Sequence, residues 1–503
     1  MVLRLVSVPV REGLATGVLS AGIMKAALLC NLVGATWAQI RGSAMDWIRT
    51  NMHTTNTRFG VLILVLVSCF VAQIARAQAH GPIPPPDPRY KADILVIVAH
   101  PDDDTALSTY LAKAVLDEGK RAAVIFTTRG NAGPNAVGME QSKALAAVRE
   151  MEARRSLAER GITNVWFLDG LDTPTQDVLH SLETVGHGNT LEATVRLIRL
   201  TRPEVILTWL PAYVAGENHG DHQASAVIAV EAFDEAADPT AFAEQLTAPR
   251  WHGGVGNYGE GLQAWQPKKI YFVSDASHPK FLEGHGPTYL ASDTCRAKNM
   301  TFAEINRLAW KQYATQVDFD EKTLSDYINM PEHLILGKSI VPSHTLDDVW
   351  AGIDARPASF SPAPGYQQPS DRGVGIELGG PWSYYREFYA AHGLKSLENL
   401  VPPQTALSYG NQLWVPLLLR NNSNQPQDVT LHAEMPAGWS GDLKDGVYHL
   451  EPRSSYPISL FLTSPSGAGQ PSPQRLSWTI TGQGITTPRV DLAVYLEFDG
   501  VSQ

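Results

Sequence analysis

The stretch Ile94–Thr105, I-L-V-I-V-A-H-P-D-D-D-T, decides the fold class of this chain. Its first five residues, Ile94 to Val98, are apolar and mostly β-branched, which favours a strand buried on both faces, as in a parallel sheet. Apolar residues then recur at helical spacing from Leu107, and Gly119 is suited to end that helix. The residues between the strand and the helix are therefore predicted to form a tight turn.

Metal-capable side chains crowd this turn. They are His100, Asp102, Asp103 and Asp104, and Pro101 fixes one backbone angle among them. In open α/β sheets, ligands bind beyond the carboxyl ends of the strands, and this turn follows such an end. Asp104 is interpreted as a helix cap and not as a ligand, because aspartate caps helices well.

Strands and helices alternate after this turn. Further strands are predicted at 124–127, 165–168 and 205–209, and helices at 141–160, 191–200 and 224–236. Strands separated by helices imply a parallel sheet with right-handed crossovers, so the predicted fold class is α/β, a Rossmann-like layer sandwich. The first strand is not followed by G-x-G-x-x-G, the fingerprint of dinucleotide binding.

A second polar cluster, E-N-H-G-D-H from Glu217 to His222, follows the strand predicted at 205–209. Both clusters come directly after a strand, so the fold can bring them together at one edge of the sheet. Two imidazoles and a carboxylate, from His100, Asp103 and His222, suit a divalent transition metal with open positions for water and substrate. The sequence therefore predicts a metal site.

The composition narrows the class of protein. The 503 residues are 44% hydrophobic and 18% charged, which predicts two or three domains with a sizeable core. The formal net charge is −11, and the first 79 residues contribute +5, which leaves −16 for the remainder. A nucleic-acid partner is not expected, since no general basic surface is available. Cys295 is the single cysteine beyond residue 79, so neither a disulfide framework nor a cysteine-rich zinc site can form there.

Residues 1–79 are predicted to be a targeting segment. Arg58 and the short apolar run 61–67 precede small-x-small cleavage sites at 75–79, a pattern typical of a secretory signal and too short for a membrane span. The stretch 24–38 is also signal-like, which leaves Met45 and Met52 as alternative starts. L-V-S-C at 66–69 resembles a bacterial lipobox, which would place a lipid on Cys69. We expect an exported protein, periplasmic or extracellular, with membrane contact only through such a lipid.

Four motifs carry a resemblance to a known family. They are A-H-P-D-D at 99–103, T-T-R-G at 127–130, R-E-x-E-A at 149–153 and H-G-D-H at 219–222. In order and spacing they resemble the LmbE/PIG-L family of zinc-dependent N-deacetylases over about residues 91–280. The resemblance implies a Rossmann-like fold, a zinc ion with iron(II) as the alternative, and removal of the N-acetyl group from an N-acetylglucosamine-type sugar or glycoconjugate.

The resemblance also implies roles for individual residues. His100, Asp103 and His222 would bind the metal, and Asp102 would be the general base. His219 would stabilise the developing oxyanion, and Asp221 would orient that histidine. These roles agree with the chemistry of amide hydrolysis, which needs an activated water, a polarised carbonyl and a protonated leaving nitrogen.

Several positions depart from the family pattern or have a second interpretation. Glu217 stands where some members place a tyrosine, and Tyr213 could compensate for it. Arg129 is a candidate for a substrate hydroxyl, or else a solvated loop residue. Arg149 and Glu152 either shape the site or form an ordinary pair on their helix.

The C-terminal part has the sequence pattern of β-strands and not of alternating strands and helices. Alternating apolar residues at 429–435, 476–480 and 490–496, separated by turns, predict a small all-β sandwich. M-P-A-G-W at 435–439 resembles the NEW3-type sandwiches appended to bacterial glycan enzymes. The aromatic group at 382–389 is interpreted as core in preference to a sugar-stacking platform. The predicted domains are 1–79 (targeting), 80–400 (deacetylase, motif core 91–280) and 401–503 (sandwich).

The sequence thus predicts an exported, metal-dependent deacetylase of N-acetylated amino sugars. Two alternatives stay open at this point. One keeps the metal and changes the bond, to a different amide or a thiol conjugate. The other is a non-catalytic glycan-binding surface protein.

Overall fold

The computed structural model describes residues 86–215, 219–247, 261–317, 320–354, 373–467, 471–485 and 488–497. Every described residue belongs to a single compact unit, which begins at residue 84. The predicted targeting segment 1–79 and Cys69 lie outside the described residues. Within the described ranges, the helices are all too short or too polar to cross a membrane.

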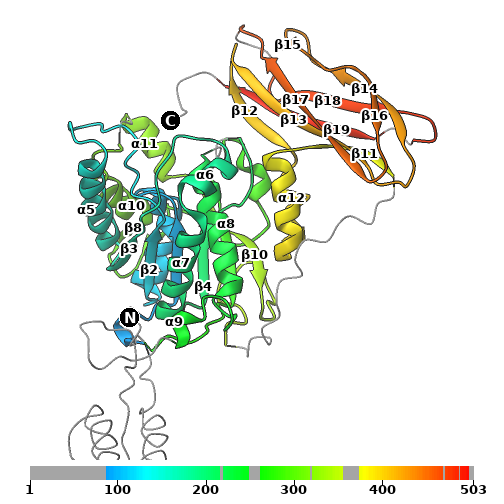
Figure 1. The fold of residues 1–503 in the computed structure, drawn as a ribbon. Helices are drawn as coiled ribbons and strands as arrows, with labels where there is room; N and C mark the ends of the chain where they lie inside the picture. Colours follow the sequence, from blue (N-terminus) through cyan, green and yellow to red (C-terminus); the bar gives the residue numbers. More distant parts are fainter. Residues whose placement is uncertain are drawn as a thin grey trace, which may run out of the picture. The chain divides into compact units, whose positions relative to one another are not determined.

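A six-stranded sheet forms the centre of the first domain, in the order β10-β5-β4-β1-β2-β3 (Figure 1). Five of its strands are parallel, and β10 is antiparallel at the edge beside β5. The strands are β1 (Ile94–Val98), β2 (Ala122–Phe126), β3 (Asn164–Phe167), β4 (Val205–Trp209), β5 (Lys269–Val273) and β10 (Ile335–Ser339). The predicted α/β fold class is therefore confirmed.

The central strand β1 separates two hydrophobic cores. Leu95 and Ile97 face one core, while Ile94, Val96 and Val98 face the other, and all five side chains are buried. Helices supply the opposite wall of each core, which is why the strand reads as a continuous apolar run. These helices are α5 (Lys143–Glu159), α6 (Val178–Thr184), α7 (His187–Thr201) and α8 (Gly220–Glu235). Helix α10 (Phe302–Trp310) packs in two smaller clusters.

The helix predicted after β1 is built from three short pieces. A 3₁₀ turn (Asp103–Leu107) is followed by the α-helical turn α4 (Ser108–Ala112) and a π turn (Lys113–Asp117). The backbone N–H groups of Thr109 and Tyr110 at the start of α4 donate to the carboxylate of Glu332, at 2.9 and 3.1 Å. Glu332 comes from the short strand β9 (Glu332–His333), so a distant segment satisfies donors that a helix start leaves open.

Glu332 gives the fold a testable pH dependence. Its burial raises the pKa of the carboxyl from its usual 4.5 to about 8. The folded state therefore holds the proton up to about pH 8, whereas the unfolded chain loses it near 4.5, so this group's contribution to stability falls as pH rises between those values. The Glu332→Gln variant never ionises. At pH 5 we expect the variant and the wild type to have the same unfolding free energy. At pH 9 we expect that of the variant, measured by urea unfolding, to be higher by on the order of a few kcal/mol.

The comparison of the two proteins at each pH isolates this group, because all other titrating groups are shared. Both are measured without added metal. A difference between variant and wild type that stays constant from pH 5 to pH 9 would contradict the raised pKa.

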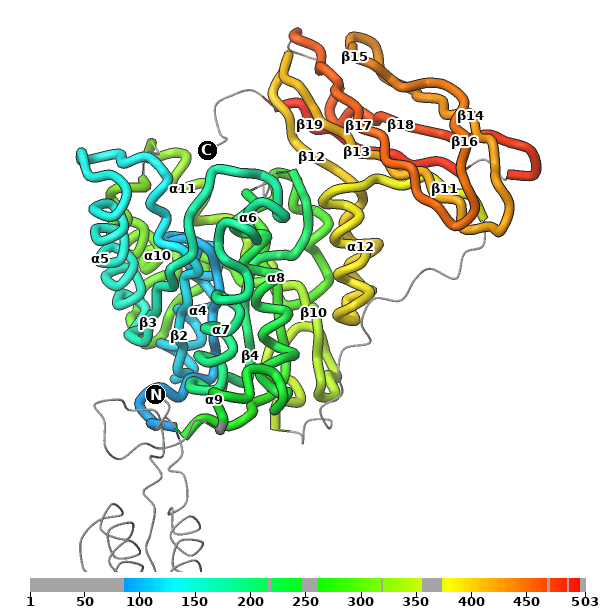
Figure 2. The backbone as a smooth tube through the Cα atoms, in the orientation of Figure 1, coloured from blue at the N-terminus to red at the C-terminus, as the bar shows by residue number. Residues whose placement is uncertain are grey.

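The second domain is a sandwich of two sheets, in the orders β11-β13-β17-β15 and β12-β19-β18-β14-β16 (Figure 2). Their inner faces enclose one core, with Trp478 at 0% exposure among its members. The strand β11 precedes the predicted domain start at 401, yet it pairs with β13 along its whole length. The strands are β11 (Val374–Leu378), β12 (Gln404–Ser408), β13 (Gln412–Asn421), β14 (Gln427–Glu434), β15 (Ser440–Gly441), β16 (Gly446–Leu450), β17 (Ser454–Thr463), β18 (Gln474–Thr481) and β19 (Arg489–Glu497). The likeness to NEW3-type sandwiches stays a prediction.

The aromatic group after β11 forms helix α12 (Pro381–His392). Three of its rings, Tyr385, Phe388 and Tyr389, are buried in the core that also holds β1, α7 and α8. They are core residues of the α/β domain, as the sequence interpretation favoured.

Candidate metal centre

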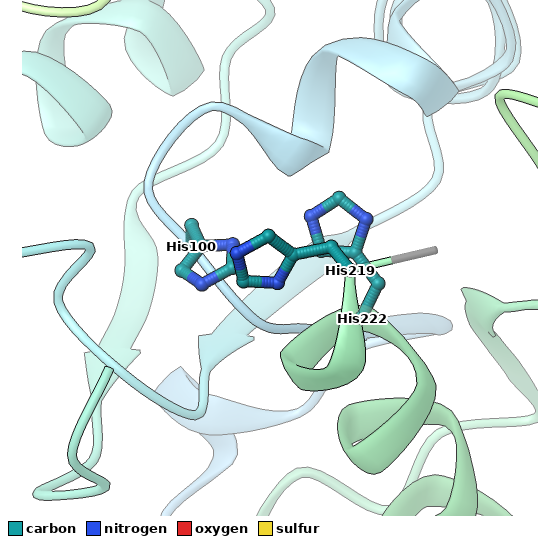
Figure 3. A group of neighbouring side chains, drawn as sticks. All are labelled: His100, His219 and His222. Atoms are coloured by element: carbon teal, nitrogen blue, oxygen red, sulfur yellow. The ribbon is translucent and has the colours of Figure 1, made fainter. Parts of the chain in front are cut away.

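Three histidines converge at the carboxyl edge of the sheet (Figure 3). His100 follows β1, while His219 and His222 lie at the start of α8, which follows β4. Because β1 and β4 are hydrogen-bonded neighbours, the two polar clusters of the sequence meet. One nitrogen from each of the three rings lies within 4.8 Å of the others.

Asp103 supplies the carboxylate of the predicted ligand set. Its Oδ2 accepts from the backbone N–H of Ala99 and His100 and from the indole of Trp209, at 2.8 to 2.9 Å. These three bonds fix the side chain and leave Oδ1 facing the histidines, 3.2 Å from His222 Nε2 and 3.6 Å from His100 Nδ1. Ligands bound tetrahedrally to zinc at ~2.0–2.1 Å are about 3.3–3.4 Å apart. The two separations measured from Oδ1 are close to this value, and the ring nitrogens that lie within 4.8 Å of one another are those of His100, His219 and His222.

His222 is held by stacking. Its ring lies 4.4 Å from the ring of Trp209, at an interplanar angle of 7°. Its Nδ1 is buried without a hydrogen-bond partner among the described residues, and so is Oδ1 of Asp275, which follows β5. Burial raises the pKa of Asp275 to about 6, against an opposing attraction from His222. Asp275 thus belongs to the electrostatic surroundings of the site, and the sequence interpretation did not include it.

His100 is flanked by carboxylates. Its Nε2 lies 3.0 Å from Asp172 and 3.4 Å from Asp221. Burial opposes a charge on this ring, but Asp172 and Asp103 outweigh it and raise the pKa of His100 well above its usual value. Sequence reasoning missed Asp172. The available signal was its place just after β3, at the sheet edge where the other clusters lie.

His219 caps helix α8. Its Nδ1 accepts from the backbone N–H of Asp221 at 3.3 Å, which places the ring proton of the neutral form on Nε2. Burial and the nearby His100 and His222 lower the pKa of His219 to about 2. This arrangement favours a neutral ring that donates its Nε2–H.

The sequence predicted that Asp221 orients His219, but the hydrogen bonds of its carboxylate go to other residues. It accepts from Ser181 Oγ at 2.6 Å and from the backbone N–H of Thr173 at 2.9 Å, and it faces His100. It lies within 4.8 Å of a His219 nitrogen as part of the group His100, Asp172, His219 and Asp221. Asp221 therefore ties the loop after β3 to the start of α8.

Asp102 has an unusual backbone. Its φ is 132°, a region that residues other than glycine rarely adopt, with asparagine and aspartate the most tolerant. Burial, and then the adjacent Asp103, raise the pKa of its carboxyl to about 8. Strain of this kind concentrates at functional sites.

The candidate substrate residues lie in different surroundings. Arg129 donates to Glu150, Asp169 and the carbonyls of Phe167 and Leu168, so it bridges α5 and the end of β3. Tyr213 contacts Trp382, with ring centroids 5.3 Å apart, and accepts from Thr405 Oγ1 at 3.3 Å. Glu217 lies outside the described residues.

Arg149 and Glu152 are both buried and hold loops of the site instead of pairing with each other. Arg149 donates to the carbonyls of Gly130 and Pro134, and Glu152 accepts from the backbone and hydroxyl of Thr315. Gly130 has a φ of 62°, and a Cβ there would lie 2.7 Å from the Arg149 guanidinium, so this position requires glycine. Of the two interpretations, the structure favours a role in shaping the site.

The predicted cap role of Asp104 is wrong. Asp104 lies inside the 3₁₀ turn, fully buried, and its carboxylate pairs with Arg160 and accepts from the hydroxyl of Tyr313. A cap accepts from the backbone N–H groups of its own first turn, whereas this carboxylate binds side chains far away in the chain.

A mostly parallel α/β sheet with a His/Asp cluster at the ends of its strands defines the class: an α/β layer fold with a candidate metal site. Residues 95–233 match the model of the PIG-L family, described as GlcNAc-PI de-N-acetylase. This part of the chain is therefore a PIG-L/LmbE-family deacetylase domain.

Individual relatives agree with the family match. A 1D-myo-inositol 2-acetamido-2-deoxy-alpha-D-glucopyranoside deacetylase of Catenulispora acidiphila is 27% identical over 213 residues, covering 39% of this chain and 60% of that protein. A protein of the same description from Frankia casuarinae is 30% identical over 162 residues, covering 29% of this chain and 52% of its own length. The chain thus spans little more than half the length of these relatives.

Among solved structures, the N,N'-diacetylchitobiose deacetylase of Pyrococcus horikoshii matches at 14% identity with a TM-score of 0.35. The match covers 57% of this chain and 94% of the Pyrococcus chain.

Proposed function

We propose that this protein removes the N-acetyl group from an N-acetylglucosamine-type sugar or glycoconjugate, with zinc as its metal. The observation that supports this most directly is the convergence of His100, Asp103 and His222 at the carboxyl edge of the sheet, within a PIG-L-family domain. The relatives' described substrate, an acetamido sugar linked to inositol, supports the substrate class.

Zinc bound at this site would polarise the amide carbonyl and lower the pKa of a water molecule towards ~7. Asp102 would take a proton from the attacking water as its oxygen adds to the carbonyl carbon, and would return a proton to the sugar nitrogen when the C–N bond breaks. His219 donates its Nε2–H to the developing oxyanion. Acetate and the free amine are the products.

Metal removal tests the proposal. Purified protein is stripped with a chelator, refilled with zinc or with iron(II), and assayed for amine release from N-acetylglucosamine, its oligosaccharides and its glycolipids. We expect activity to vanish on stripping, to return with metal, and to be absent from His222→Ala under all conditions, because one of three metal ligands is lost.

The substrate that turns over fastest identifies the conjugate. Metal-restored release that persists in His222→Ala would contradict the site assignment. Tight metal binding without release from any acetamido sugar would redirect the proposal to another amide.

We also propose that the chain is exported and that its membrane contact, if it has any, is a lipid on Cys69. The signal-like run 61–67 and the L-V-S-C sequence support this. Metabolic labelling with a palmitate analogue, compared between the wild type and Cys69→Ser, tests the lipid. Fractionation of the cells tests export.

A further inference from the structure

The segment from the end of β4 to the first turn of α8 carries His219 and His222 into the site. Its described residues are held by parts of the chain well beyond residues 95–233, which the family model matches. Tyr389 of α12 donates its hydroxyl to the carbonyl of Pro211 at 2.5 Å. The backbone N–H of Ser277 donates to the carbonyl of Ala215 at 3.0 Å.

Helix α12 also holds the other end of this segment, in the first turn of α8. Tyr385 donates its hydroxyl to Oε1 of Gln223 at 2.8 Å. Gln223 follows His222 directly, is fully buried, and donates through Nε2 to the carbonyl of Gln176 at 3.3 Å. Gln176 lies on the loop after β3 that also carries Asp172. The hydroxyl of Tyr385 is therefore linked to the start of α8 and, through Gln223, to the loop after β3.

Tyr385 and Tyr389 act from one face of α12. They are four residues apart, their rings are 5.7 Å apart and nearly parallel, and both are about 95% buried. Helix α12 runs beside α8 (Figures 1 and 2), and it follows directly on β11, a strand of the sandwich. Between the two anchors, Tyr213 contacts Trp382 of α12 and Thr405 of the sandwich strand β12.

We propose that Tyr385 and Tyr389 are positioning residues for the metal centre, through which α12 and the attached sandwich hold the histidine-bearing start of α8 in its metal-binding geometry. A buried hydroxyl that donates to a buried acceptor sets the position of that acceptor, because leaving the acceptor unpaired is costly. Gln223 follows His222 directly in the first turn of α8, and Pro211 lies just after β4, so the two hydrogen bonds hold the chain on either side of the histidines. The inference rests on the proposed metal site and assigns a mechanical role to the C-terminal domain.

The test compares Tyr385→Phe, Tyr389→Phe and the double variant with Tyr384→Phe in the purified protein. Tyr384 neighbours them on α12, and its ring contacts are with Tyr385 and Phe388. Zinc affinity is measured by competition with a chromophoric chelator, and hydrogen exchange is followed over 211–223. We expect zinc affinity about 3- to 10-fold weaker in each single variant, a larger loss in the double variant, faster exchange over 211–223, and wild-type behaviour in Tyr384→Phe.

Kinetics separate positioning from general stabilisation. If the protein deacetylates as proposed, kcat falls several-fold in the two variants while KM changes less than twofold, because the reacting groups and not the sugar contacts are displaced. Should Tyr385→Phe fail to fold, Gln223→Met removes this hydrogen bond together with the one to the Gln176 carbonyl, and is expected to weaken zinc binding at least as much.

Unchanged zinc affinity and exchange in the double variant would overturn the inference, whatever its melting temperature. Both readouts need no substrate. A wild type that binds zinc but releases no amine would therefore count against the proposed function alone.

Discussion

Replacing Asp102 by asparagine is expected to lower kcat for amine release by about 10³-fold while leaving the zinc content unchanged. A positioned general base contributes ~10²–10⁴-fold to a proton transfer, and Asp102 directly precedes the predicted ligand Asp103 without being a predicted ligand itself. Asparagine is the informative substitution because it tolerates the φ of 132° at this position, so the backbone of the turn is kept. Zinc content is measured by atomic emission and kcat at saturating substrate.

Asp169→Asn is the matched control. Asp169 lies on the loop after β3, its side chain is 97% exposed, and its contact is with Arg129. We expect its kcat to remain within twofold of the wild type. If Asp102→Asn retained most of its activity with a full complement of zinc, another group would have to take the proton, and Asp275 would be the next carboxylate to replace.

The second large effect concerns stability and not catalysis. Asp104 and Arg160 form an ion pair with both side chains at 0% exposure, and Arg160 also donates to Ser108 and Ser156 at 3.0 to 3.1 Å. Removing one partner leaves a charge buried without compensation, which costs ~3–5 kcal/mol. We therefore expect Asp104→Ala to lower the unfolding free energy of the α/β domain by about that amount, read from the urea midpoint in the presence of a chelator.

Two further variants define the origin of that loss. The double variant Asp104→Leu, Arg160→Met removes both charges and is expected to recover much of the stability, since apolar replacements of a buried pair are often neutral. Lys322→Met breaks the exposed pair with Asp326, with side chains 85% and 68% exposed, and is expected to change stability by less than ~0.5 kcal/mol. A double variant as unstable as Asp104→Ala would mean that packing, and not the unpaired charge, causes the loss.

The chelator is essential to this measurement. Asp104 is adjacent to the predicted metal ligand Asp103, and a ligand that binds the folded state raises its apparent stability. Without metal, the shift in midpoint contains no contribution from a change in metal binding.

Much of the site could be predicted because its parts are local in the chain. The apolar run Ile94–Val98 is followed at once by His100, Asp102 and Asp103, and β4 is followed by His219 and His222. Parallel strands place their carboxyl ends at one edge, so the α/β pattern alone implied that these two clusters meet. The sequence also indicated correctly that the aromatic group of α12 is core.

Other features required the tertiary structure, because they join residues whose separation in the chain carries no periodic signal. His100 and Asp172 are 72 positions apart, and Thr109 and Glu332 are 223 apart. The partner of Asp104 could not be read locally either, and the sequence therefore suggested a cap where the fold has a buried ion pair.

The features that the sequence predicts and those that need the tertiary structure differ for one physical reason. Strand and helix formation, and the chemistry at the end of each strand, follow from the spacing of neighbouring side chains. Which buried carboxylate meets which donor, and which tyrosine of α12 holds the start of α8, depends on strand order and packing, which bring distant segments together only once the whole domain has closed. By itself the sequence determined the fold class and the motif residues of the site; the tertiary structure decided how those residues are oriented and by what they are held.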